Sequence, residues 1–392
     1  MNLREDGASA VPYVVQSNVP QRMARGWHCL GLADQYKDGK PHGVFAFNTK
    51  LVVFQNQQGA LSVLDAYCPH MGGDLSQGTV RGDSVACPFH DWRWGDNGRC
   101  TAIPYAKHIP VRARTRKWHA LEENRLLFIW HDPEGKAPPP EVAIPRIDGL
   151  FDDTWSQWDM SVHKLATTGR ELVDNLVDAA HFFYVHGEGK GAGASYFKNV
   201  FDGHVAWQFL EMGTDPDAPA TYPKDKPGVP AEEIAGWMRG ETRYYGPAYL
   251  HSHLMNRFPG DTVEFIEILA QVPVTPETFR LYMGFSVKKR PDLSEEQNAA
   301  RTRAVAERNR IGTLQDVHIW EHKTRVDNPL LCDTDGPVYQ LRRWYEQFFV
   351  DVADIKPEMT ARLEIETDTR HALPVWDRQA AEKIAEEQGN GA

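Results

Sequence analysis

Residues 67–101 read YCPHMGGDLSQGTVRGDSVACPFHDWRWGDNGRCT, and this stretch decides the fold of the N-terminal part of the chain. It contains two short pairs of metal-binding residue types, Cys68-x-His70 and Cys87-x-x-His90, each in a turn that follows an apolar run. Two such loops can hold one dinuclear [2Fe–2S] cluster. With Cys on one iron and His on the other, neutral imidazoles replace two thiolate charges and raise the reduction potential. The pattern therefore predicts a cluster that accepts electrons.

The same four residues permit a tetrahedral zinc site, because zinc binds the same ligand types. The context favours the cluster, since proline follows both cysteines, and Trp92 and Trp94 could shield a cluster from solvent. Zinc stays open as the alternative.

The residues around these loops predict a β-rich N-terminal domain. Short apolar runs bounded by Gly, Asn and Asp extend from about 27 to 130 and are typical of strands. The segment GKAPPPE at 135–141 suits a semi-rigid connector. A chain of 392 residues exceeds the usual size of one domain. We expect two domains, residues 1–145 with a core at about 26–132, and residues 146–392.

Beyond the connector the pattern is mixed, and the fold class of the whole chain is predicted to be α+β. The expected elements are a helix at 169–186, strands at 262–274 and 279–289, a long charged helix from about 294 to 325, and loops at 187–195 and 213–232.

Composition excludes several classes of protein. The formal net charge is −11 and no Lys- or Arg-rich run stands out, which disfavours nucleic acid as a partner. No run of about 18 apolar residues and no signal-peptide pattern is found, so we expect no membrane association and a cytoplasmic location.

A second candidate metal site lies in the predicted helix at 169–186. Asp178 and His181 share a helix face, but His181 and His186, five residues apart, differ by about 140° on an ideal α-helix. Both imidazoles can reach one metal only if the helix ends or distorts between them, and Gly187 and Gly189 offer an end. Taken singly, either histidine is better explained as a packed core residue or a helix-terminal surface residue. Together, after the cluster motif, they are predicted ligands.

A non-haem iron(II) oxygenase needs two histidines and one carboxylate on one face, which leaves open positions for O2. Asp316 is the predicted carboxylate, because its helical neighbours carry no opposite charge and a carboxylate on an apolar face is costly unless it is paired or metal-bound. Glu264 and Glu267, on a strand-like run, are weaker candidates.

The quoted cluster stretch, with sixteen residues between His70 and Cys87, resembles the Rieske domains of ring-hydroxylating oxygenases. Many members of that family have Gly after the final His, whereas this chain has Asp91, as in the ketosteroid 9α-hydroxylase branch. The resemblance continues through DAAHFFYVH, YYGPAYL and DGPVYQLRRWYEQFFVDVADI, over nearly the whole chain.

This resemblance implies a helix-grip catalytic domain with an antiparallel sheet, of the START/Bet v1-like kind. It implies that Cys68 and Cys87 bind one iron of the cluster and that His70 and His90 bind the other. It also implies that a mononuclear Fe(II) is bound by His181, His186 and Asp316.

In that family the motif aspartate, here Asp178, is not an iron ligand. It bridges the first mononuclear-site histidine to a Rieske histidine of the neighbouring subunit, which implies a homotrimer. An NADH-dependent flavin/iron–sulfur reductase would supply electrons one at a time.

The implied reaction is monooxygenation of a 3-ketosteroid at the 9α position during steroid metabolism. Phe182, Tyr245 and Trp320 are the predicted substrate-binding residues of a large apolar pocket. The loops at 187–195 and 213–232 differ from the ketosteroid enzymes, so a side-chain-bearing steroid or another polycyclic or terpenoid compound is the alternative substrate.

Two other classes of protein compete with an oxygenase. A non-catalytic Rieske electron carrier with a lipid-binding domain would hold iron only in the cluster. A zinc-stabilised module that binds an apolar ligand would be colourless. Neither explains why the cluster motif, the spaced histidines and the helical aspartate occur together.

Overall fold

The structure is a computed structural model that describes residues 15–16, 20, 22–213, 237–258 and 261–390. Most of the predicted loop at 213–232 lies outside these residues. Within the described residues, no helix is both long enough and apolar enough to cross a membrane.

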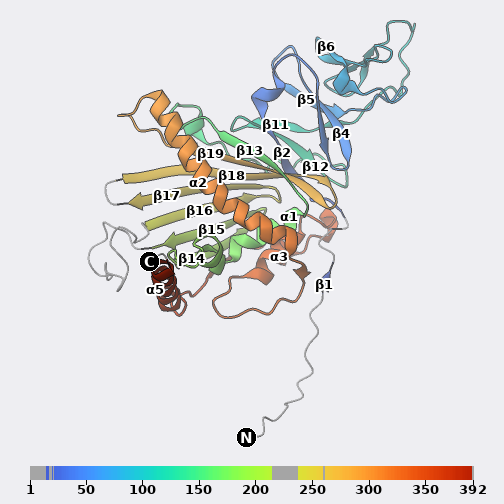
Figure 1. Ribbon diagram of the computed structural model, residues 1–392. Helices are drawn as coiled ribbons and strands as arrows, with labels where there is room; N and C mark the ends of the chain where they lie inside the picture. Colours follow the sequence, from blue (N-terminus) through green and yellow to red (C-terminus); the bar gives the residue numbers. More distant parts are fainter. Residues whose placement is uncertain (1–14, 17–19, 21, 214–236, 259–260, 391–392) are drawn as a thin grey trace.

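The N-terminal domain consists of three small antiparallel sheets, with strand orders β10-β5-β4-β3, β11-β12-β2 and β6-β7-β8-β9. The last of these lies at the outer tip of the domain, far from the large sheet (Figure 1). The strands are β2 (Gly26–Leu32), β3 (His42–Ala46), β4 (Thr49–Gln55), β5 (Leu61–Asp65), β6 (Thr79–Arg81), β7 (Ser84–Ala86), β8 (Arg93–Gly95), β9 (Cys100–Ala102), β10 (Lys117–Trp118), β11 (Ala120–Glu123) and β12 (Leu126–His131).

The second domain is built on one antiparallel sheet of eight strands in the order β13-β19-β18-β17-β16-β15-β14-β21. Its strands are β13 (Asp159–Leu165), β14 (Ala194–Asp202), β15 (Val205–Met212), β16 (Trp237–Tyr245), β17 (Tyr249–Phe258), β18 (Asp261–Thr275), β19 (Thr278–Val287) and β21 (Leu363–Glu366). The α+β class and the antiparallel sheet predicted from the sequence are therefore confirmed.

Helix α2 (Glu295–His322) runs across the sheet (Figure 1). Ser294 begins it with a capping box, since its hydroxyl accepts from the Gln297 N–H while the Gln297 side chain accepts from the Ser294 N–H. The prediction of a long helix from about 294 to 325 is confirmed. The other helices are α1 (Gly169–Val173), α3 (Val338–Glu346), α4 (Pro357–Thr360) and α5 (Leu373–Asn390).

The continuous helix predicted at 169–186 is wrong. The chain forms α1, a 3-10 turn η4 (Asp174–Val177) and a π-helical turn η5 (Phe182–His186). The break has a local cause at Asp178, which is extended and whose carboxylate accepts from the N–H groups of Ala180, at 3.0 Å, and His181, at 3.2 Å. A residue that caps a helix start in this way ends the preceding helix.

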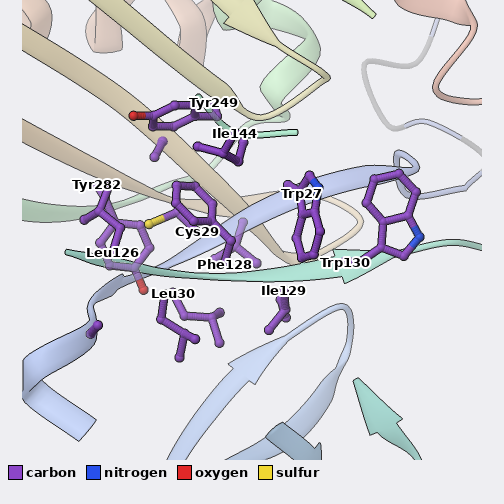
Figure 2. Packing of buried hydrophobic residues seen from close by; sticks show 14 of the residues in the cluster. Trp27, Cys29, Leu30, Leu126, Phe128, Ile129, Trp130, Ile144, Tyr249 and Tyr282 are labelled. Atoms are coloured by element: carbon purple, nitrogen blue, oxygen red, sulfur yellow. The ribbon is translucent and has the colours of Figure 1, made fainter. Parts of the chain in front are cut away.

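One hydrophobic core joins the two domains. Strands β2 and β12 pack Trp27, Cys29 and Phe128 toward Tyr249 and Tyr282 of the large sheet (Figure 2). The rings of Phe128 and Tyr249 meet edge to face, with centroids 5.1 Å apart. The boundary near residue 145 stays a prediction.

Candidate metal centres

The two predicted cluster loops have the same backbone hydrogen bonds. The N–H of Cys68 donates to the carbonyl of Gly73, and its carbonyl accepts from the N–H of Gly72. Cys87 repeats this pattern with Trp92 and Asp91 at the corresponding positions. Each cysteine is therefore presented by the same type of turn.

This repetition explains the position of Asp91, which corresponds to Gly72 in the first loop. Gly72 has φ of +75° and Asp91 has φ of +54°, both in the left-handed region that favours glycine. Asp tolerates that region better than most residues, and the Asp91 carboxylate accepts from Arg93 at 2.9 Å. The ion pair helps to hold a turn for which many family members use glycine.

The four predicted cluster ligands lie together at the tip of the N-terminal domain. Cys68 and Cys87 are buried, with 2% and 4% exposure, and the ring centroids of His70 and His90 are 4.9 Å apart. Burial raises the pKa of the Cys68 thiol, and the nearby Cys87 thiol raises it further. The Nδ1 atom of His90 is buried and has no hydrogen-bond partner among the described residues. A metal ion would satisfy such an atom.

The arrangement of these ligands bears on the zinc alternative. A single tetrahedral ion would gather all four ligand atoms around one point. Among the described residues, His181, His186 and Asp316 are the group whose ligand atoms all lie within 4.8 Å of one another. The four N-terminal ligands do not form such a group, and this favours a dinuclear cluster over zinc.

Both tryptophans of the cluster motif contact its ligands. The Trp92 ring stacks on the His70 ring, with centroids 4.4 Å apart and planes at 9°. Trp94 is fully buried, and its Nε1–H donates to the Cys68 sulfur at 3.3 Å. Hydrogen bonds to cluster sulfurs are among the features that set the reduction potential.

The π-helical turn brings the two histidines of the second site together. The N–H of Gly187 donates to the carbonyl of Phe182, five residues earlier, at 2.9 Å. This wider turn places residues five apart on one side, and the ring centroids of His181 and His186 are 5.1 Å apart. A Cβ at position 187 would lie 2.8 Å from the Phe183 carbonyl oxygen, so the turn requires glycine there. The sequence predicted that the helix would end or distort between His181 and His186, and it distorts into a π turn there.

Asp316 on α2 completes the group. Its side chain is buried, with 8% exposure, and its Oδ2 lies 3.3 Å from Nε2 of His186. Burial alone would lower the pKa of His186, but the hydrogen bond and charge of Asp316 raise it. The ring therefore turns its Nε2 toward Asp316, while its buried Nδ1 has no partner among the described residues.

The backbone carbonyl of Asp178 orients His181 for metal binding. Its Nδ1 lies 2.7 Å from the Asp178 carbonyl oxygen, which can only accept, so Nδ1 carries the proton and Nε2 is free. Burial lowers the pKa of His181 despite the charges of Asp178 and Asp316. The neutral imidazole that binds metals is therefore favoured.

The two weaker carboxylate candidates lie on opposite faces of β18. Glu264 pairs with Lys288 at 2.7 Å and His253 at 2.8 Å, away from the site. Glu267 is half-buried and accepts from the Thr313 hydroxyl at 3.3 Å. Burial raises the pKa of Glu267 to about 7. Its ligand atoms lie outside the compact group formed around Asp316.

The candidate site opens into a cavity of about 410 Å³ between the sheet and α2, within the range of small-molecule sites. Phe182 and Trp320 line it, as the sequence predicted, and the Trp320 indole donates to the Asn175 side chain at 3.2 Å. Tyr245 does not line it. Its ring points to the other face of β16, because side chains alternate along a strand, and packs near Tyr249.

Sequence reasoning missed the polar side chains of the cavity wall. They lie on inward-facing positions of strands and on α2, and the signal that could have revealed them is a polar residue at an otherwise apolar inward position. They are Gln208, Thr242, Ser252, Asn256 and Asn309.

Comparisons with known proteins agree with this geometry. The Rieske [2Fe-2S] domain family matches residues 26–113, and the 3-Ketosteroid 9alpha-hydroxylase C-terminal domain family matches residues 129–349. A 3-ketosteroid-9-alpha-monooxygenase oxygenase component of Rhodococcus rhodochrous is 48% identical over 385 residues, covering 98% of this chain and 95% of the relative. The Mycobacterium tuberculosis protein of that name is 49% identical over 367 residues, covering 93% of this chain and 92% of the relative.

Among solved structures, NdmB of Pseudomonas putida CBB5 has a TM-score of 0.65 at 16% identity, covering 89% of this chain and 100% of that chain. At this identity the likeness supports the fold alone. The relatives found by sequence are similar enough to show the family, and this chain belongs to the Rieske oxygenase family of 3-ketosteroid-9-alpha-monooxygenase oxygenase components.

Proposed function

We propose that this chain is the oxygenase component of a two-component monooxygenase that hydroxylates a 3-ketosteroid at the 9α position. The observation that carries this proposal is the group formed by His181, His186 and Asp316 at the wall of a largely apolar cavity. Two histidines and one carboxylate with space beside them suit a non-haem iron(II) that binds O2. When bound, the [2Fe–2S] cluster and this iron supply the electron-transfer and oxygen chemistry.

The protein's own residues position the reactants. The Asp178 carbonyl fixes the ring of His181, and the π turn keeps His186 beside it. The cavity wall holds the substrate and excludes water, while Trp320 places an indole one helical turn from Asp316. The balanced reaction takes the substrate, O2, two electrons and two protons, and yields the hydroxylated steroid and water. The separate reductase supplies the electrons.

We propose that the assembly is a homotrimer in which Asp178 joins neighbouring subunits. Its side chain is 46% exposed although it adjoins His181, whose side chain is only 10% exposed. A carboxylate between a buried ligand and the surface suits a contact with a Rieske histidine of another subunit. The cytoplasmic location stays a prediction.

The proposal is tested by metal analysis, EPR and visible spectra of the wild type and of His181→Ala. We expect about three irons and two acid-labile sulfides per chain, falling to about two irons in the variant with the cluster spectrum intact. His318→Ala, which changes an exposed histidine of α2, is the matched control and should keep all three irons.

Substrate specificity is tested in the same preparations by incubation with 3-ketosteroids under ¹⁸O2. One labelled oxygen in a 9α-hydroxylated product supports the proposal. Two irons in the wild type would support an electron carrier instead, and zinc without sulfide would overturn the cluster assignment. A product only from side-chain-bearing steroids or other polycyclic compounds would replace the proposed substrate.

A further inference from the structure

An exposed basic surface lies beside the cluster loops. Residues 97–121 contain six Lys and Arg side chains and no Asp or Glu, in a chain whose formal net charge is −11. The expectation that no basic run stands out is therefore wrong for this segment. We call these six exposed side chains the basic strip: Arg99, Lys107, Arg112, Arg114, Arg116 and Lys117.

The cations of the basic strip have no anionic partners. Within the described residues none of the six forms an ion pair, unlike basic residues elsewhere such as Arg342, which pairs with Asp174 at 2.7 Å. Arg116 lies instead over the Trp118 ring, 3.9 Å from its centroid. Six like charges on one short segment repel one another, so the strip contributes nothing favourable to folding through charge. A partner that supplies negative charge would offset this repulsion.

The basic strip is fixed to the cluster loops by backbone hydrogen bonds. The N–H of Cys100 donates to the Ala113 carbonyl at 3.0 Å, and the N–H of Thr115 donates to the Gly98 carbonyl at 2.8 Å. Ala113 also packs against the hydrophobic cluster that contains both ligand cysteines. The cations therefore keep a defined position relative to the cluster ligands.

A short chain of aromatic side chains leads from this surface to a cluster ligand. The Trp92 indole donates to the Tyr105 hydroxyl at 2.7 Å, and its ring stacks on His70. Tyr105 itself is 64% exposed. The half-buried Trp92 ring thus links this surface to an imidazole of the proposed cluster.

Exposed apolar side chains lie between two of the cations, Lys107 and Arg112. Val111 is 93% exposed and Ile109 is 41% exposed, both between the basic residues of the strip. An apolar centre surrounded by charge is typical of a protein interface, where charge steers the encounter and apolar area stabilises the contact.

We propose that the basic strip, with Tyr105 and Val111, is the docking surface for an electron-transfer protein with an acidic face around its redox centre. The inference rests on the proposed function, which requires electrons from a separate protein. In the docked complex the partner's reduced centre loses one electron and is oxidised, and the cluster beside His70 gains that electron. No covalent bond forms or breaks. Elsewhere the chain's surplus of negative charge repels such a partner, so the strip also orients the encounter.

The test measures complex formation with a plant-type [2Fe–2S] ferredoxin, a small carrier rich in carboxylates, as a function of ionic strength. The variant Lys107→Gln/Arg112→Gln/Arg114→Gln removes three charges and leaves Arg116 on Trp118. We expect the Kd at low salt to rise about tenfold, and the dependence of log Kd on ionic strength to become shallower. The rate of cluster reduction at low ferredoxin concentration should fall by the same factor.

The matched control Arg303→Gln/Arg343→Gln/Lys356→Gln removes three charges from exposed positions of the other domain and should leave both quantities unchanged. An equal loss in both variants would overturn the proposal, because it would show an effect of net charge alone. A change of oligomeric state in the strip variant would also overturn it, since the strip would then be a subunit contact. Steroid hydroxylation in a single turnover after chemical reduction should be intact in the strip variant. Its absence in the wild type as well would instead contradict the proposed function.

Discussion

The cluster loops take all four ligands from residues 68–90, whereas the catalytic-domain site joins His181 and His186 to Asp316 on another element. The first set depends on two turns with the same backbone hydrogen bonds. The second depends on a distorted helix and on how α2 packs against it. The geometry of a local site does not depend on distant packing, whereas the geometry of a site assembled from remote segments does.

Tertiary contacts hold the two halves of the second site in place. Trp376 of α5 stacks on Phe183 inside the π turn, with ring centroids 5.8 Å apart. At the other end, Asp174 accepts from Arg342 and lies 3.4 Å from Lys323, just past the end of α2. The first contact fixes the π turn against α5, and the contact of Asp174 with Lys323 connects the histidine segment to the end of the helix that carries Asp316.

The sharpest test of this difference is Asp316→Ala, for which we expect the largest effect. The variant loses the carboxylate that completes the catalytic-domain group, so mononuclear iron and turnover should be lost. Turnover should fall by more than the 10–100-fold typical of losing an outer-shell partner. The cluster spectrum should not change, because no cluster ligand depends on α2. Metal analysis and steroid turnover measure the two effects.

Two further variants decide between the acidic residues. Glu264→Ala and Glu267→Gln should both retain mononuclear iron, because Glu264 lies on the other face of β18 and Glu267 lies outside the compact group. Loss of iron in Glu267→Gln with retention in Asp316→Ala would reverse the assignment of the carboxylate ligand.

A smaller effect is expected for Asp178→Asn, which acts between the two regions rather than within either. The amide oxygen still caps the turn that begins at Ala180, so both metal contents should stay normal. Turnover should fall by about 10–100-fold, as for other outer-shell partners, because the proposed link between subunits loses its charge. Rapid-mixing measurement of cluster reoxidation in the presence of substrate checks this. A normal rate would remove Asp178 from the electron path.

The sequence predicted the local features well and the non-local ones in part. The cluster motif and the strands at 262–274 and 279–289 are visible because turns, ligand spacing and apolar patterns lie within a few residues of one another. Asp316 could be suggested from its uncharged helical neighbours, but its distance to His186 depends on the packing of α2. Its position as a ligand stays a prediction.

The failures have physical causes of the same kind. The helix at 169–186 breaks because Asp178 caps a new turn, which overrides an otherwise helical apolar pattern. Tyr245 was placed in the pocket from its residue type, whereas the direction of a strand side chain depends on register that the sequence does not reveal. The basic strip was overlooked because the acidic whole-chain balance conceals a local surplus of charge.

The smallest effect concerns a buried histidine, His28, and a half-buried one, His131, neither of which is a proposed metal ligand. His28 and His131 lie in the N-terminal domain, and each donates one ring N–H to the Ala24 carbonyl. The distance is 3.2 Å from Nε2 of His28 and 3.0 Å from Nδ1 of His131. Burial lowers the pKa of His28 to about 3 and that of His131 to about 4. Each folded-state pKa is below the unfolded value of about 6.5, so the unfolded state binds more protons as the pH falls. The stability is therefore complete above about pH 6.5 and is lost progressively below it.

At pH 5 each histidine should cost about 2 kcal/mol of unfolding free energy relative to neutral pH. Urea unfolding of the wild type and His131→Gln at pH 7.5 and 5.0 measures this, since the acid-induced decrease should be about 2 kcal/mol smaller in the variant. Glu267, whose pKa is raised to about 7, stabilises the folded state as the pH falls. This contribution is the same in the wild type and in His131→Gln, so it cancels in the difference between them. His322→Gln, at an exposed position of α2, should behave like the wild type. An equal decrease in the wild type and His131→Gln would show that acid sensitivity arises elsewhere, and the N-terminal domain would then owe its stability to its turns and core rather than to neutral buried imidazoles.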